Sequence, residues 1–193
     1  VKTANWTIVK SVDAIDYDKI DEIGYPVFIK PNSGGSSVAT NLVKSKDQVE
    51  SAVIEALKYD DIVMIEEYIK GIEHTSFILN GEVFPTIRIT SDHEFFDYEA
   101  KYSTSNGARE EVVELEESVA KTLEDTSRTC WDIYNCRGYV RADYIITEDN
   151  QVYLLEINTL PGMTETSLIP KSAKARGIDY SGLLDKLIES AEI

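Results

Sequence analysis

The sequence predicts an α+β protein whose sheets are largely antiparallel. Two pairs of β-rich segments are each joined by a short polar turn, Asn80-Gly81 in one and Glu148–Asn150 in the other, which is the pattern of a β-hairpin. Apolar residues in 112–134 recur at helical spacing over a length that few strands reach. Hairpins combined with separate helices favour α+β over a parallel sheet built from alternating strands and helices.

Composition limits the partners that this chain can have. Its 193 residues are 42% hydrophobic and 28% charged, as in ordinary globular proteins, and the net charge is −16. Such a charge repels nucleic acids and anionic membranes, and no apolar run reaches membrane-spanning length, so we expect neither partner. Cys130 and Cys136 have no further cysteine or histidine at zinc-binding spacing, which favours reduced thiols in a cytoplasmic protein.

The first 70 residues alternate between predicted strands and helices. Strands are predicted at 6–10, 27–30, 38–43 and 62–68, with helices at 16–23 and 45–58. Ser45 and Gln48 have the spacing of a capping box at the start of the second helix. The small residues of 32–37 predict a loop, and Lys70-Gly71 marks a boundary between two lobes.

The rest of the chain contains the hairpins and the longest helix. Strands are predicted at 74–79, 82–86, 88–90 and 94–96, followed by a mobile polar loop at 97–111. A helix is expected over 112–134, then a hairpin within 139–158, and a final helix from about residue 180.

The hairpin within 139–158 gathers polar residues that could act together. Side chains two apart on a strand share a face, so Arg141 points with Asp143, and Glu156 with Asn158. A symmetric turn then predicts three pairs: Thr147 with Val152, Asp143 with Glu156, and Arg141 with Asn158.

Two opposed carboxylates destabilise a sheet unless a cation lies between them. Carboxylate and amide oxygens suit Mg²⁺, so the pattern predicts a metal site of a phosphoryl-transfer enzyme. The residues of 159–162 end the strand and offer backbone N–H groups beside it. The alternative is that these acidic residues only face solvent, as most acidic residues on strands do.

Three other segments have weaker signals. Lys30 ends a buried strand before the small-residue loop, which could cover phosphates but lacks the Walker A pattern. Residues 63–73 could present backbone groups to a flat base, with Glu73 accepting hydrogen bonds from a ribose. Lys101, on the polar loop, could follow a phosphate during transfer. Alone, each is more readily explained as a surface turn, a solvated strand end or a surface lysine.

Together these segments resemble a known family. FIKP with GSS, MIEEYIKGIE, FDYEAKY, RAD and LLEINTLPGMTETSLIP occur in the order and spacing of the ATP-grasp ligases, specifically the D-alanine–D-alanine ligases of bacterial cell-wall synthesis. The resemblance implies two α+β lobes, 1–69 and 70–193, clasping ATP between them. It implies ATP-dependent joining of two D-alanines through an acyl phosphate, for peptidoglycan precursors.

The resemblance also implies roles for single residues. Contacts with ATP would come from Lys30, Ser36, Ser37, Glu66, Glu67, Tyr68, Ile69, Glu73 and Lys101. Two Mg²⁺, or Mn²⁺ in their place, would be held by Asp143, Glu156 and Asn158. Arg141, the Gly162 backbone N–H and Lys101 would stabilise the charge that develops during reaction, and the second amino acid would meet Tyr102, Ser167 and Leu168.

The chain departs from the family in ways that leave alternatives open. The family's N-terminal lobe, with part of the first D-alanine site, is absent from this sequence, so we expect an ATP-binding fragment that is inactive alone. A homodimer is expected of the full-length enzyme. Gly34, Ala39-Thr40 and Gly107-Ala108 differ from the usual loop residues, so D-serine or D-lactate as second substrate stays open. A nucleotide-binding module without ligase activity is the other alternative.

Overall fold

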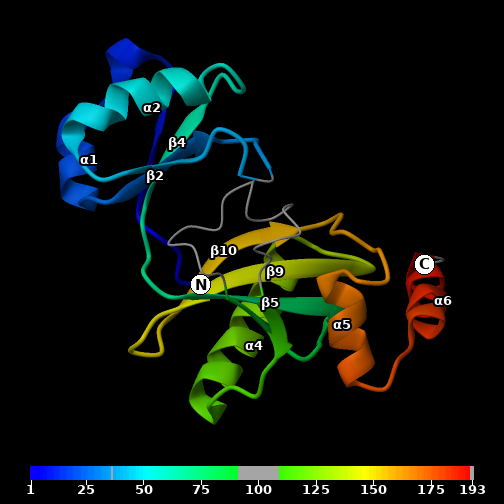
Figure 1. Ribbon diagram of the computed structural model, residues 1–193. Helices are drawn as coiled ribbons and strands as arrows, with labels where there is room; N and C mark the ends of the chain where they lie inside the picture. Colours follow the sequence, from blue (N-terminus) through cyan, green and yellow to red (C-terminus); the bar gives the residue numbers. More distant parts are fainter. Residues whose placement is uncertain (36, 91–108, 192–193) are drawn as a thin grey trace. The chain divides into compact units, whose positions relative to one another are not determined.

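The computed structural model describes residues 1–35, 37–90 and 109–191, which form two compact units (Figure 1). The N-terminal unit contains Ala4–Ile69, and the C-terminal unit contains Lys70–Thr90 and 109–191. Val1–Thr3 also belong to the C-terminal unit, where the N–H of Leu154 donates to the carbonyl of Lys2 (2.9 Å). The strand predicted at 94–96 lies outside the described residues, as does most of the loop predicted at 97–111.

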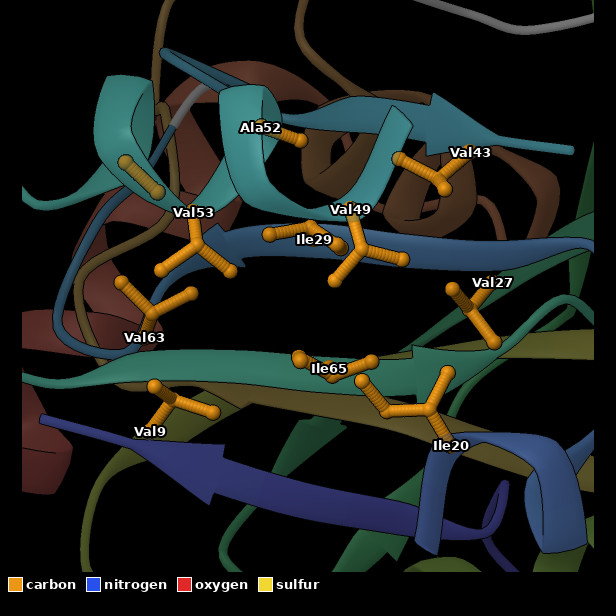
Figure 2. Close-up of a cluster of buried hydrophobic side chains, with 11 residues drawn as sticks. Val9, Ile20, Val27, Ile29, Val43, Val49, Ala52, Val53, Val63 and Ile65 are labelled. Atoms are coloured by element: carbon orange, nitrogen blue, oxygen red, sulfur yellow. The ribbon is translucent and has the colours of Figure 1, made fainter. Parts of the chain in front are cut away.

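The N-terminal unit is a four-stranded antiparallel sheet with helices on one face. Its strands β1 (Trp6–Val9), β2 (Val27–Pro31), β3 (Asn41–Val43) and β4 (Val63–Glu67) lie in the order β1-β4-β2-β3. Helices α1 (Tyr17–Ile23) and α2 (Val49–Ala56) cover one face, and Figure 2 shows their side chains meeting those of β2 and β4. The buried cluster comprises Val9, Ile20, Val27, Ile29, Val43, Val49, Ala52, Val53, Ala56, Val63 and Ile65.

Two short 3₁₀ helices, η1 (Val12–Ala14) and η2 (Lys46–Gln48), precede the two α-helices. Helix α1 is capped by Asp16, whose side chain accepts from the Lys19 N–H (3.0 Å). The capping box predicted for α2 is wrong, because the Ser45 side chain makes no capping bond. Gln48 instead accepts from the Lys44 N–H (2.8 Å), and the α-helix starts at Val49.

The strand predicted at 38–43 is shorter in the structure and begins at Asn41. Ser37 and Ala39 have φ of 58° and 52°. A residue in this left-handed region cannot continue an extended strand, so the apolar Val38 lies in a turn.

The C-terminal unit is a six-stranded antiparallel sheet in the order β10-β9-β5-β7-β8, with β6 paired to β5. The strands are β5 (Ile72–Leu79), β6 (Glu82–Val83), β7 (Ile87–Thr90), β8 (Arg109–Val112), β9 (Tyr139–Ile146) and β10 (Val152–Asn158). Helix α4 (Glu117–Ile133) packs on one face through Val119, Leu123 and Cys130. Helices α5 (Leu168–Ala175) and α6 (Tyr180–Ala191) pack around Phe77 on the other (Figure 1). The α+β class with antiparallel sheets is therefore confirmed.

The turn between β5 and β6 is confirmed at Asn80-Gly81, where both residues have positive φ (49° and 80°) as a tight hairpin requires.

The helix predicted over 112–134 is wrong at its start. Residues Arg109–Val112 pair with β7, and the helix begins only at Glu117. Val112 and Leu115 nevertheless match the helical spacing of the apolar residues in α4. This match is a coincidence, because Leu115 reaches the core beneath α4 from the segment between β8 and the helix. No helix in the described ranges is long and apolar enough to cross a membrane.

His74 lies in β5 with 5% of its surface exposed, and its Nδ1–H donates to the Ile72 carbonyl (2.9 Å). Burial lowers the pKa of His74, and the charge of Arg88 acts in the same direction. The unfolded chain therefore binds a proton that the folded chain does not, once the pH falls below about 6.5.

We expect the free energy of unfolding of the wild type to fall, relative to His74→Gln, between about pH 7 and 5. Denaturant titrations at several pH values would measure this difference. His93→Gln, at the chain's other histidine, is the matched control. Parallel curves for wild type and His74→Gln would show that His74 is protonated equally in both states.

Candidate functional site

A β-bulge in β10 orients the polar residues of the β9–β10 hairpin. Before the bulge, Leu154 pairs with Tyr144; after it, Glu156 pairs with Asp143 and Asn158 with Arg141. These last two pairs confirm the predicted register. The predicted pair Thr147 with Val152 is wrong, because Val152 pairs with Ile146.

The extra residue at the bulge is Leu155, and it changes which side chains share a face. Val152 and Leu154 point into the core beneath α4, with Tyr144 and Ile146. Strict alternation would put Glu156 into that same core. The bulge instead turns Glu156 and Asn158 to the opposite face, with Arg141 and Asp143.

Arg141 and Asp143 form the centre of this polar cluster. The Arg141 Nε donates to Asp143 Oδ1 (2.8 Å) and more weakly to Oδ2 (3.2 Å), while Nη2 donates to Oδ2 (2.7 Å). The same Nη2 lies 3.8 Å from Glu156 Oε1. Thr75 on β5 pairs directly with Asp143, and its hydroxyl donates to Asp143 Oδ1 (2.6 Å).

The electrostatics of the cluster favour a charged guanidinium. Burial acts to lower the pKa of Arg141, but hydrogen bonds and charge from Asp143, followed by the charges of Glu156 and Glu73, outweigh it and raise the pKa. Glu73 lies two residues before Thr75 on β5, on the same face. Three carboxylates thus surround one arginine on this face of the sheet.

The oxygen donors fit a divalent cation only in part. Among the residues described, no three or more histidine, cysteine or acidic side chains cluster closely enough to form a complete site. Asp143, Glu156 and the amide of Asn158 offer two carboxylates and one carbonyl, and Asn158 Oδ1 is oriented by the Leu160 N–H (3.0 Å). Mg²⁺ is commonly held in this way, by one or two carboxylates with phosphate oxygens completing its shell. The residues therefore fit Mg²⁺ bound together with a phosphorylated ligand.

Ser167 organises the loop that follows β10. Its Oγ accepts from the Thr164 N–H (3.1 Å) and lies 2.8 Å from Thr164 Oγ1. Ser167 also precedes the first turn of α5, which begins at Leu168. Gly162 is exposed in the same loop. The Ser167 hydroxyl, which is predicted to contact the second amino acid, thus also forms hydrogen bonds that stabilise this loop.

The N-terminal unit has its own group of predicted residues on the sheet face away from the helices. Lys30 and Glu66 form an ion pair there, with about a third and an eighth of their side chains exposed (33% and 12%). Phe28 and Met64 share this face with them, and the Tyr68 ring meets the Phe28 ring edge-on (5.5 Å between centroids). A partly apolar surface beside a half-buried lysine suits a flat ring linked to an anion.

Two other predicted residues of this unit have structural contacts. The Glu67 carboxylate accepts from the Asn5 side chain (2.8 Å) and backbone N–H (3.2 Å), which joins β4 to the segment before β1. Ile69 is half-buried at the end of the unit. Ser37 lies in the turn before β3, whereas Ser36, Lys101 and Tyr102 lie outside the described residues.

Thr75 is the residue of the cluster that the sequence did not indicate. Its only signal is position, since it lies two residues after Glu73 on the same strand. The register that brings it opposite Asp143 joins segments 68 residues apart, and no local pattern predicts such a pairing.

Comparisons with known proteins identify relatives of this chain. The family model described as "D-ala D-ala ligase C-terminus" matches residues 2–189. D-alanine--D-alanine ligase B of Clostridium perfringens is 50% identical over 99% of this chain and 63% of its own length. The D-alanine--D-alanine ligase of Bacillus anthracis has a TM-score of 0.86 at 42% identity, covering 98% of this chain and 62% of that one. Its structure complexed with ATP has a TM-score of 0.84 at 39% identity, covering 98% and 61%.

These matches span nearly the whole of this chain but little more than three-fifths of the length of the relatives. The two units with antiparallel sheets are the ATP-grasp fold of those ligases. The chain belongs to the family of the C-terminal region of D-alanine–D-alanine ligases.

Proposed function

We propose that this chain is the ATP-binding region of a ligase that joins two D-alanines for peptidoglycan precursor synthesis. The observation that carries the proposal is the hairpin register, which opposes Asp143 to Glu156 and Arg141 to Asn158 within a chain that matches the ligase family over residues 2–189. The B. anthracis ligase complexed with ATP supports ATP as a substrate.

In this proposal the two units act as the central and C-terminal lobes of the family, with a boundary at residues 69 and 70. Lys30 and Glu66, with the nearby Glu67, Tyr68 and Ile69, bind the adenine and phosphates. Their apolar surroundings and the Lys30–Glu66 ion pair support this role. Ser36 and Ser37 cover the phosphates, and Glu73 binds the ribose.

The C-terminal unit supplies the metal ligands. Asp143, Glu156 and Asn158 would hold two Mg²⁺, and their oxygen donors support this choice. When bound, the metal ions offset charge on the phosphate groups during transfer. Mn²⁺ has similar ligand preferences and would be accepted in its place.

The proposed reaction has two steps. A carboxylate oxygen of the first D-alanine attacks the γ-phosphorus of ATP, ADP leaves, and an acyl phosphate forms. The amine of the second D-alanine attacks the acyl carbon, loses a proton, and phosphate leaves as the peptide bond forms. Lys101 stabilises the transferring phosphate, and Arg141 with the Gly162 N–H stabilises the oxyanion. Tyr102, Ser167 and Leu168 position the second amino acid.

We further propose a cytoplasmic, homodimeric full-length enzyme.

We expect the 193-residue chain to bind ATP in the presence of Mg²⁺ but to form no dipeptide. Calorimetry with and without Mg²⁺ would measure the binding. A chain that binds no nucleotide, or that releases phosphate in response to D-alanine, would contradict the proposal.

The second substrate is tested on the full-length protein. Ligation rates with D-alanine, D-serine and D-lactate as acceptors would be compared at equal ATP, and D-alanine is expected to react fastest. Faster reaction with D-serine or D-lactate would reassign the acceptor. Nucleotide binding without ligation of any acceptor would support a nucleotide-binding module instead.

A further inference from the structure

Thr75 lies opposite the predicted metal ligand Asp143, and nothing in the proposed function gives it a role. It is 2% exposed, Asp143 is 5% exposed, and the two residues are direct partners in the β5–β9 ladder. We propose that Thr75 is a positioning residue that holds the Asp143 carboxylate ready for the metal. This inference rests on the proposed function, because it takes Asp143 as a metal ligand.

The hydrogen bonds of Asp143 differ between its two oxygens. Oδ1 accepts two short bonds, from the Thr75 hydroxyl (2.6 Å) and from Arg141 Nε (2.8 Å). Among the described residues, only Arg141 donates to Oδ2, at 2.7 Å from Nη2 and at 3.2 Å from Nε. Both oxygens thus accept two bonds, but those to Oδ1 come from two different side chains and those to Oδ2 from the guanidinium of Arg141.

The two donors to Asp143 differ in freedom of movement. Thr75 is β-branched and fully enclosed, so its χ1 is restricted and its hydroxyl stays where the strand register puts it. Arg141 is a long side chain, 19% exposed, whose guanidinium can shift towards Glu156 or a substrate anion. If Arg141 shifts, Oδ2 would become available to a metal ion, and the Thr75 hydroxyl would still orient the carboxylate through Oδ1.

The Thr75 hydroxyl has a poorer alternative acceptor, which argues that its bond to Asp143 dominates. The Ala142 carbonyl lies at 3.3 Å, well beyond the 2.6 Å to Asp143 Oδ1. A bond to an ionised acceptor is also stronger than one to a neutral carbonyl. Without the hydroxyl, the orientation of the carboxylate about χ2 would depend on Arg141, whose guanidinium is free to shift.

The test uses Mn²⁺ as the probe, titrated into the 193-residue chain with a non-hydrolysable ATP analogue and followed by electron paramagnetic resonance. Thr75→Val keeps the shape of the side chain but removes the donor. We expect Mn²⁺ affinity to fall by about 10- to 100-fold, as when other groups that orient a metal ligand are lost. Thr75→Ser keeps the donor and is expected to restore binding close to that of the wild type.

Wild-type affinity in Thr75→Val would overturn the positioning role, as would a loss in Thr75→Ser equal to that in Thr75→Val. Asp143→Asn separates this failure from a failure of the proposed function. If Asp143→Asn binds Mn²⁺ as well as the wild type does, Asp143 is not a metal ligand. If only Asp143→Asn loses binding, the metal assignment stands and the role of Thr75 is refuted.

Circular dichroism would establish that each variant is folded. If Thr75→Val does not fold, Thr75→Ala removes the same donor and takes its place in the titration. In the full-length enzyme, the loss of the donor is expected to raise the apparent KM for Mg²⁺ and leave the KM for D-alanine unchanged. Equal changes in both would point to a general structural role and contradict the proposal.

Discussion

Glu156→Gln is expected to abolish ligation by the full-length enzyme. The substitution keeps the size of the side chain and its position opposite Asp143 but removes the charge of one of the two carboxylates proposed as metal ligands. Metal ions contribute several kcal/mol of transition-state stabilisation, and each ~1.4 kcal/mol changes the rate about tenfold. We therefore expect a loss of at least about 10³-fold in kcat at saturating D-alanine, measured by phosphate release.

The folding stability of Glu156→Gln should be close to that of the wild type. The Glu156 side chain is 61% exposed and its distance of 3.8 Å from Arg141 is that of a weak ion pair. Glu148→Gln makes the same change of charge at an exposed position in the turn of the same hairpin and should leave ligation unchanged. Wild-type turnover by Glu156→Gln would refute the metal assignment.

The hairpin illustrates how far the sequence could predict this site. The pairing of Asp143 with Glu156 follows from turn position and strand alternation, and the structure has that pair. The bulge at Leu155 could not be predicted, because one extra residue changes hydrogen bonding without any turn residue to indicate it. Strand alternation without the bulge would have put Val152 and Leu154 on the same face as Glu156. They are instead buried beneath α4, and this packing is a tertiary effect that the local sequence does not indicate.

The errors in the fold have similar physical causes. Residues 109–112 form an edge strand because β7 offers unpaired backbone groups to them, which local spacing cannot reveal. Ser37 and Ala39 adopt left-handed backbone conformations although neither is glycine. No glycine therefore marks this turn, and the start of the following strand was predicted too early in the sequence. Elements with strong local signals, such as the Asn80-Gly81 turn, were predicted correctly.

Gly71→Ala is expected to destabilise the C-terminal unit by about 3 kcal/mol, at the upper end of overpacking effects. A Cβ at Gly71 would lie 2.4 Å from Ile145 Cγ2, 2.5 Å from the Ile146 carbonyl oxygen and 2.9 Å from its carbon. The Ile145 side chain could rotate away, but the Ile146 backbone belongs to the β5–β9 ladder and cannot move without breaking it. Its φ is outside the left-handed region, so the requirement for glycine is steric.

This effect can be measured in one unit of the protein, because the two tryptophans lie in different units. In a Trp6→Phe background, Trp131 fluorescence reports urea unfolding of the C-terminal unit, where Trp131 packs against the core beneath α4. Gly162→Ala is the matched control, since a Cβ there meets nothing closer than Ser167 Oγ at 3.4 Å.

Lys70-Gly71 first indicated a boundary because glycine breaks regular structure. Equal urea midpoints for Gly71→Ala and Gly162→Ala would mean that Gly71 serves to end regular structure. They would contradict the view that glycine is required there by its close approach to β9.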